Sequence, residues 1–121
     1  MKYAIAALSL LLAGCMGPTL RDEAPAYSWV AKRTFDQSVA CVTDNLNGYF
    51  SAHAPAGKPI VHRIVEQRPG MIVKIVPENH PGQHNPYFVR VMELSKRETV
   101  VDLYVYPDWS DATLTALRPC L

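Results

Sequence analysis

TFDQSVACVTDNLNGYF, residues 34–50, carries the strongest structural signal in the chain. Thr34 and Gln37 form a capping-box pattern, in which the threonine hydroxyl accepts from the Gln37 backbone N–H and the Gln37 side chain reaches back. Apolar residues then recur at steps of three and four: Phe35, Val39, Val42, Leu46 and Tyr49 or Phe50. This period predicts an amphipathic helix of about four turns.

Two pairs of β-branched runs follow this helix and predict two hairpins. The runs at 60–67 and 71–76 flank Arg68-Pro69-Gly70. Proline sets the first φ of a type II turn and glycine tolerates the positive φ that follows, so this tripeptide favours a tight reversal. The runs at 87–94 and 99–106 flank four polar residues that favour a second turn.

The last part of the chain predicts a short helix that opens at Asp108 and ends before Pro119. The order helix, hairpin, hairpin, short helix is typical of an α+β domain. We expect one two-layer domain over residues 34–121, with a four-stranded antiparallel sheet and both helices on one face.

The segment before this domain contains glycine, two prolines and mixed charges without a clear period. Such a composition predicts a tether, which we place at residues 15–33. Tyr27, Trp29 and Val30 leave a second interpretation open, in which part of the segment lies against the domain as a short extended stretch.

The first 15 residues have the layout of a secretory signal peptide: a charged start at Lys2, an apolar run to Leu12, and small residues. Leu12-Ala13-Gly14-Cys15 resembles the lipobox of bacterial lipoproteins. The resemblance implies that residues 1–14 are removed and that Cys15 becomes the acylated first residue. An apolar run this short is not long enough for a transmembrane helix, which needs about 20 residues. Secretion with cleavage at another position remains the alternative.

Acylation anchors a chain to lipid without a membrane span, because each buried methylene contributes about 0.8 kcal/mol. In bacteria with two membranes, lipoproteins of this class go to the outer membrane unless an acidic residue follows the modified cysteine. Met16 follows Cys15. The resemblance therefore implies a location at the periplasmic face of the outer membrane, held there by fatty acyl chains.

The chain has three cysteines. If Cys15 carries lipid, Cys41 and Cys120 remain as a pair in an oxidising compartment, where a disulfide is expected. It would close a loop of about 80 residues and contribute roughly 4–5 kcal/mol. A redox-active pair is the alternative, although such pairs more often occur as Cys-x-x-Cys. Cys41 lies about 200° from Val39 on a helical wheel, so we expect the pair beside the helix rather than inside the main core.

Charge excludes some classes of partner. The formal net charge is +1, and loss of Lys2 with the signal brings it close to zero. Nucleic-acid binding and polybasic membrane adhesion both need a basic surplus, so neither is expected. The expected partners are the membrane, through the acyl chains on Cys15, and another envelope protein.

Metal binding has one candidate cluster, His80 and His84 with Glu78, because imidazole and carboxylate suit zinc or copper. Pro81 and Gly82 interrupt the spacing and prevent helical presentation of both rings. An exposed polar turn is the favoured interpretation, so no metal or cofactor is predicted.

No motif of an enzyme is present: the sequence lacks a Gly-x-Ser-x-Gly elbow, a phosphate-binding glycine loop and a free Cys–His pair. Asp102 and Asp108 are carboxylates without a defined partner. His62 alternates with apolar residues and is expected to be a partly buried strand histidine with a local hydrogen bond. His53 is expected in solvent.

A possible partner surface comes from Tyr104 and Tyr106, which share the strand face opposite Val101, Leu103 and Val105. With Trp109 they form the kind of aromatic group found at recognition surfaces. The alternative is that the final helix, the aromatics of the tether or a second copy covers them. The same face carries Arg90 and Asp102, expected to oppose each other in solvent.

The sequence therefore predicts a small lipid-anchored envelope lipoprotein that acts as a structural or protein-interaction module without catalytic activity. The alternatives are a periplasmic module that binds a small ligand or metal, and an inhibitor or accessory of an envelope enzyme.

Overall fold

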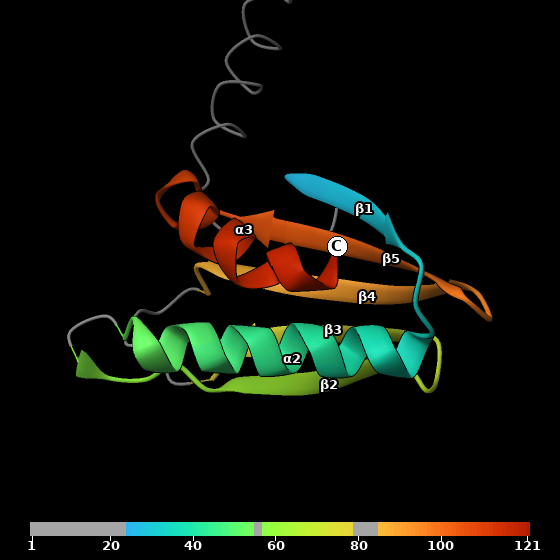
Figure 1. The fold of residues 1–121 in the computed structure, drawn as a ribbon, viewed down its shortest axis with the longest axis horizontal. Helices are drawn as coiled ribbons and strands as arrows, with labels where there is room; N and C mark the ends of the chain where they lie inside the picture. The colour runs from blue at the N-terminus through green and yellow to red at the C-terminus, as the bar shows by residue number, and fades with distance from the viewer. Residues whose placement is uncertain (1–23, 55–56, 79–84) are drawn as a thin grey trace, which may run out of the picture.

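A computed structural model describes residues 24–54, 57–78 and 85–121. The five strands in these ranges form one antiparallel sheet in the order β1-β5-β4-β3-β2. Both α-helices lie on the same face of this sheet, with α2 in front of β2 and β3 and α3 in front of β4 and β5 (Figure 1). In chain order the elements are β1 (Tyr27–Ala31), α2 (Phe35–Ala52), β2 (His62–Arg68), β3 (Ile72–Pro77), β4 (Tyr87–Ser95), β5 (Glu98–Val105), η2 (Pro107–Trp109), α3 (Ser110–Leu117) and η3 (Arg118–Cys120).

The sheet has five strands, so the prediction of a four-stranded sheet was wrong. The additional strand is β1, which pairs antiparallel with β5, Tyr27 opposite Leu103 and Ala31 opposite Thr99. Its residues fall in the segment predicted as a tether, and the second interpretation of that segment, a short extended stretch against the domain, describes them. The physical reason lies in β5, which is buried along most of its length, so the backbone N–H and C=O groups on its second edge need partners and β1 supplies them.

The two hairpins and both helices are confirmed. The capping box of Thr34 and Gln37 opens α2, with Gln37 N donating to the threonine hydroxyl and Thr34 N to the glutamine side chain. Gly70 has a φ of +72°, the left-handed conformation expected in the β2–β3 turn. Among the described residues, no helix is long and apolar enough to cross a bilayer.

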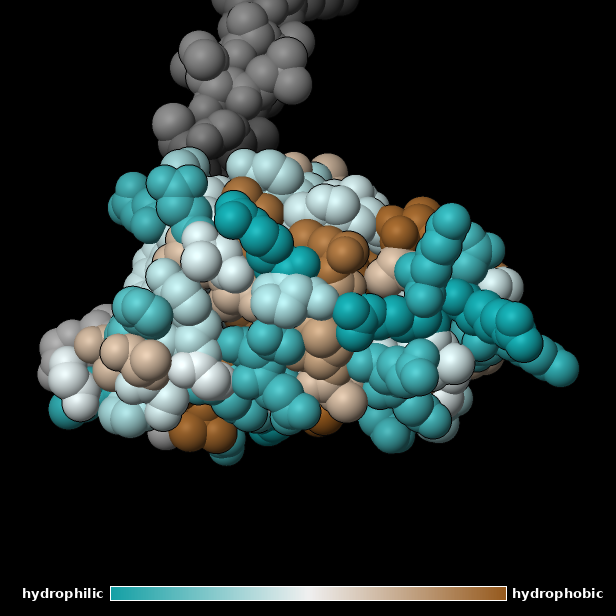
Figure 2. All heavy atoms as spheres, viewed as in Figure 1, coloured by the Kyte–Doolittle hydropathy of each residue, from teal (hydrophilic) through white to brown (hydrophobic). Residues whose placement is uncertain are grey.

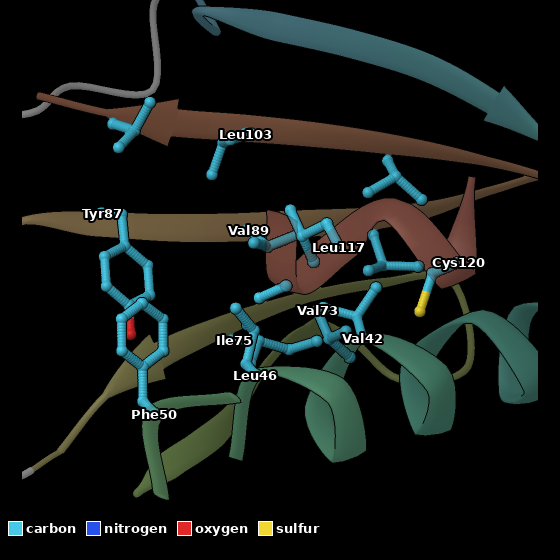
Figure 3. Close-up of a cluster of buried hydrophobic side chains, with 14 of the residues drawn as sticks. Val42, Leu46, Phe50, Val73, Ile75, Tyr87, Val89, Leu103, Leu117 and Cys120 are labelled. Atoms are coloured by element: carbon cyan, nitrogen blue, oxygen red, sulfur yellow. The ribbon is translucent and has the colours of Figure 1, made fainter. Parts of the chain in front are cut away.

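The main core lies between the helices and the sheet (Figure 3). Helix α2 buries one residue in each turn along the side that faces the sheet, and α3 buries Leu117 on the same side of the sheet. Each strand contributes alternate residues to the main core, because successive side chains point to opposite faces of the sheet. The helix contributes Ser38, Val42, Leu46 and Phe50, and the sheet contributes Val73, Ile75, Tyr87, Val89, Val91, Val101, Leu103 and Val105.

The other side of the sheet, which we call the outer face, carries the remaining alternate residues. Val76, Phe88 and Tyr104 form a second, smaller buried cluster there. The helical face shown in Figure 2 is covered mainly by polar side chains, with apolar atoms showing between them. The outer face is the opposite surface of the molecule from the one in that view.

Candidate functional site

The disulfide predicted between Cys41 and Cys120 is present, with the two Cα atoms 5.7 Å apart. It joins α2 to the C-terminal turn η3. Cys41 is half-buried on the flank of the helix, as its position on the helical wheel predicts. Cys120, however, is 1% exposed and belongs to the main core, so the expectation that the pair lies outside the core was wrong for this residue. The Asn45 amide lies 3.4 Å from both sulfur atoms.

Tyr104 does not face solvent, so the interpretation in which it is covered describes it better than the interpretation as an exposed partner surface. It is 2% exposed and stacks on Phe88, with ring centroids 4.4 Å apart. The guanidinium of Arg90 lies 5.4 Å from the centre of the Tyr104 ring. The tyrosine is covered because β5 is a central strand, so side chains of β4 lie over it on the outer face.

Tyr106 and Trp109 do not complete an aromatic surface with Tyr104. Trp109 is half-buried on the helical side of the sheet, 5.9 Å from Phe50 and 5.8 Å from Tyr87 between ring centroids. Tyr106 is half-buried, and its hydroxyl is buried without a hydrogen-bond partner among the described residues. The three residues predicted as one partner surface are therefore divided between the two faces of the sheet.

Arg90 and Asp102 are paired, as predicted, with Arg90 Nη2 3.2 Å from Asp102 Oδ2. The expectation that this pair lies on a solvated face was wrong, since the Asp102 side chain is only 5% exposed. Ser28 on β1 donates to the second carboxylate oxygen over 2.5 Å. Strand β1 therefore covers the Asp102 carboxylate and supplies a second hydrogen-bond partner to it. In the predicted four-stranded sheet this side of Asp102 would be open to solvent.

The most connected polar group in the main core is a chain of three side chains, Asn47, His62 and Tyr87. Asn47 Oδ1 lies 2.9 Å from the His62 backbone nitrogen and 2.8 Å from His62 Nδ1. The Tyr87 hydroxyl lies 2.5 Å from His62 Nε2. An amide oxygen only accepts, so Nδ1 carries the proton, and Nε2 accepts the proton of the Tyr87 hydroxyl.

Aromatic rings pack around the hydrogen-bonded group of Asn47, His62 and Tyr87. Phe50 stacks on Tyr87 with ring centroids 5.4 Å apart, and Trp109 packs against both rings. Burial lowers the pKa of His62 from 6.5 to about 4, because the charged imidazolium loses its hydration. For the same reason burial raises the pKa of the Tyr87 hydroxyl. Both groups are therefore neutral over the whole physiological range.

The hydrogen-bonded group of Asn47, His62 and Tyr87 has a structural role. Both ring nitrogens of His62 are occupied by buried side chains of the protein, so neither is directed at a substrate. His62 is the buried strand histidine that the sequence predicts, at 6% exposed. Its hydrogen bonds are not local, however, because Asn47 is 15 residues away in the sequence and Tyr87 is 25. Sequence reasoning found the histidine and missed both partners.

Three of the predicted site residues lie outside the described ranges: Cys15, His80 and His84. The predictions made for them stay predictions. Glu78 is exposed at the end of β3. Within the described ranges, no group of three or more His, Cys, Asp or Glu residues is arranged to hold a metal ion. His53 is exposed, as expected, and stacks on Tyr49.

No family model matches the chain, and no curated protein shows significant sequence similarity to it.

Proposed function

We propose that this chain is a lipid-anchored lipoprotein of the bacterial cell envelope, exported by residues 1–14 and held at the periplasmic face of the outer membrane by acyl chains on Cys15. Its folded domain acts by binding rather than by catalysis. The observation that carries the proposal is the disulfide between Cys41 and Cys120. With these two residues joined, Cys15 is the third of three cysteines and the one that follows the lipobox-like Leu12-Ala13-Gly14.

The disulfide supports the proposal in two ways. Disulfides form in exported proteins and are rare in reducing compartments, so the pairing fits a periplasmic location. It also leaves a single thiol at the position where acylation is expected. Because an unpaired thiol in an exported protein is a reactive liability, its modification by lipid resolves the odd number of cysteines.

The buried polar side chains form hydrogen bonds with one another instead of facing a substrate, and this supports a binding role rather than a catalytic one. The buried His62 and Tyr87 bond to each other and to the half-buried Asn47, and the Asp102 carboxylate bonds to both Arg90 and Ser28. Active sites usually contain ionisable groups poised to exchange protons with a substrate. In the described part of this domain the buried ionisable groups are instead neutral or ion-paired, which stabilises the fold.

Metabolic labelling with an alkyne fatty acid in a bacterial host tests the anchor. The full chain should incorporate the label, co-sediment with membranes and start at an acylated Cys15 in mass spectrometry. Cys15→Ser should abolish the label and keep residues 1–14 attached. Cys41→Ala/Cys120→Ala is the matched control, because it removes two cysteines and should leave the labelling unchanged. An unmodified Cys15 in the wild-type chain would contradict the proposal.

A further inference from the structure

One end of the outer face carries four apolar side chains in direct register across four strands. Val30 on β1 lies opposite Val100 on β5, Val100 opposite Met92 on β4, and Met92 opposite Ile72 on β3. We call these four residues the apolar row. Val30 is 56% exposed and the other three are half-buried. Leu94, two residues beyond Met92 on β4, is also 56% exposed.

Basic side chains surround the apolar row. Arg68 on β2 lies opposite Ile72, and Lys32 follows the end of β1. Lys96 and Arg97 form the turn between β4 and β5. All four are exposed. Two acidic residues lie nearby: Glu98 is half-buried beside the Ser95 hydroxyl, and Glu93 is exposed but lies opposite Thr99, which places it on the helical face of the sheet rather than on the outer face. The near-zero net charge of the chain therefore conceals a local basic surplus, and the exclusion of basic membrane adhesion from total charge alone does not hold for this surface.

From this arrangement we propose that the apolar row and its four flanking cations dock on a bilayer that presents anionic phospholipid headgroups. The acyl anchor of the proposed function brings this surface close to lipid. Eight residues lie between Cys15 and Ala24, where the described structure begins, and the distance from Cys15 to Ala24 is at most about 30 Å when the chain is fully extended. Strand β1, which contributes Val30, is the first element of the described structure.

The chemistry of the surface favours lipid over a protein partner. Protein hot spots are enriched in Trp, Tyr and Arg clustered in a buried centre, whereas the centre of this surface is aliphatic and its basic residues lie at the rim. Lysine and arginine side chains can lay their methylene stems along an apolar surface and direct their charges to headgroups. A basic patch beside acyl chains is a common contribution to membrane binding, and here it would orient the anchored domain on the lipid surface.

The test uses residues 15–121 with Cys15→Ser, which lack the signal segment and any acyl chain but contain every described element. Co-sedimentation compares vesicles of pure phosphatidylcholine with vesicles that also contain phosphatidylglycerol. We expect measurable binding to the anionic vesicles, little binding to the neutral ones, and a decrease in binding as salt rises. Because Cys15 is not acylated here, this result is independent of whether the anchor is confirmed.

Two matched pairs of variants locate the binding surface. Lys96→Glu/Arg97→Glu should reduce the partition coefficient about tenfold or more, and Lys58→Glu/Arg118→Glu, an equal charge change elsewhere on the surface, should reduce it much less. Leu94→Ser should weaken binding, and Leu121→Ser, also exposed, should not. Circular dichroism checks that each variant is folded.

Three results would overturn the proposal. The first is equal binding to neutral and anionic vesicles, and the second is an equal effect of the two charge-reversal variants. The third is a dimer in light scattering that Leu94→Ser dissociates, since the apolar row would then pair with a second copy of the chain rather than with lipid.

Discussion

The Tyr87 hydroxyl donates to Nε2 of His62 over 2.5 Å, in the interior of the domain. The direction of this bond is fixed from the opposite side of the ring, where Asn47 accepts from Nδ1. A protonated imidazole would donate from both nitrogens, and the Tyr87 hydroxyl could accept this bond by turning its own hydrogen away. It is therefore burial that keeps His62 neutral in the folded state.

Stability should fall as the pH falls from about 6.5 to about 4. The pKa of His62 is lowered to about 4 in the folded state, so the unfolded chain binds a proton first in this window. The contribution is fully present above pH 6.5 and lost below pH 4. It amounts to about 3 kcal/mol of unfolding free energy. Urea unfolding at a series of pH values measures it.

The control for this effect is a comparison of two histidine variants. His62→Gln should flatten the pH dependence between pH 4 and 6.5, while His53→Gln, at an exposed position, should follow the wild type. Carboxylates also titrate in the lower part of this range, so the difference between the two variants is the quantity of interest. Parallel curves for both variants would exclude His62 as the titrating group.

Asn47→Asp should raise the pKa of His62. The aspartate occupies nearly the same volume as asparagine and can accept the same two hydrogen bonds, but its negative charge favours the imidazolium. Nuclear magnetic resonance titration of the His62 ring protons reports the change directly. Asp44, exposed on the same helix, offers a comparison, since Asp44→Asn alters one charge on α2 and should leave the His62 titration unchanged. An unshifted His62 in Asn47→Asp would show that the two side chains are not in contact in solution.

The elements predicted correctly are those whose signals are local. The capping box at Thr34 and Gln37, the i, i+3, i+4 stripe of α2 and the Pro69-Gly70 turn each lie within a few residues of sequence. Each of these patterns identifies its own element without reference to distant parts of the chain. The pairing of Cys41 with Cys120 could be predicted for a different reason. The lipobox resemblance assigned Cys15 to lipid, and only these two cysteines then remained.

The errors concern contacts between distant segments. Strand β1 is five residues long and pairs with residues about 70 positions later, so Tyr27, Trp29 and Val30 left the extended interpretation open without deciding it. A signal was present in β5, where Val100, Val101, Leu103 and Tyr104 are apolar on both faces, as in a central strand. Interpreting β5 as central would have required a second neighbouring strand beside it, for which residues 27–31 were one candidate, and would have placed Tyr104 in the interior.

Replacement of both Cys41 and Cys120 with alanine should lower the unfolding free energy by about 4 kcal/mol. The disulfide closes a loop with a sequence separation of 79, and the entropy that it removes from the unfolded chain grows with loop length. Denaturant unfolding of the variant and of the oxidised parent, both with Cys15→Ser, measures the difference. Alkylation of the folded parent should label no thiol before reduction. A loss below about 1 kcal/mol would mean that native-state strain cancels most of the entropic gain.

The Ser28–Asp102 hydrogen bond tests whether β1 is part of the folded sheet in solution. Asp102→Asn removes the charge that faces Arg90 and should cost about 1–3 kcal/mol, since the pair is largely buried. The decisive quantity is the coupling with Ser28→Ala in a double-mutant cycle. If β1 docks as described, the two substitutions should couple by at least about 0.5 kcal/mol, because each removes a partner of the other. Additive effects would place Ser28 away from Asp102, and the sheet would then end at β5.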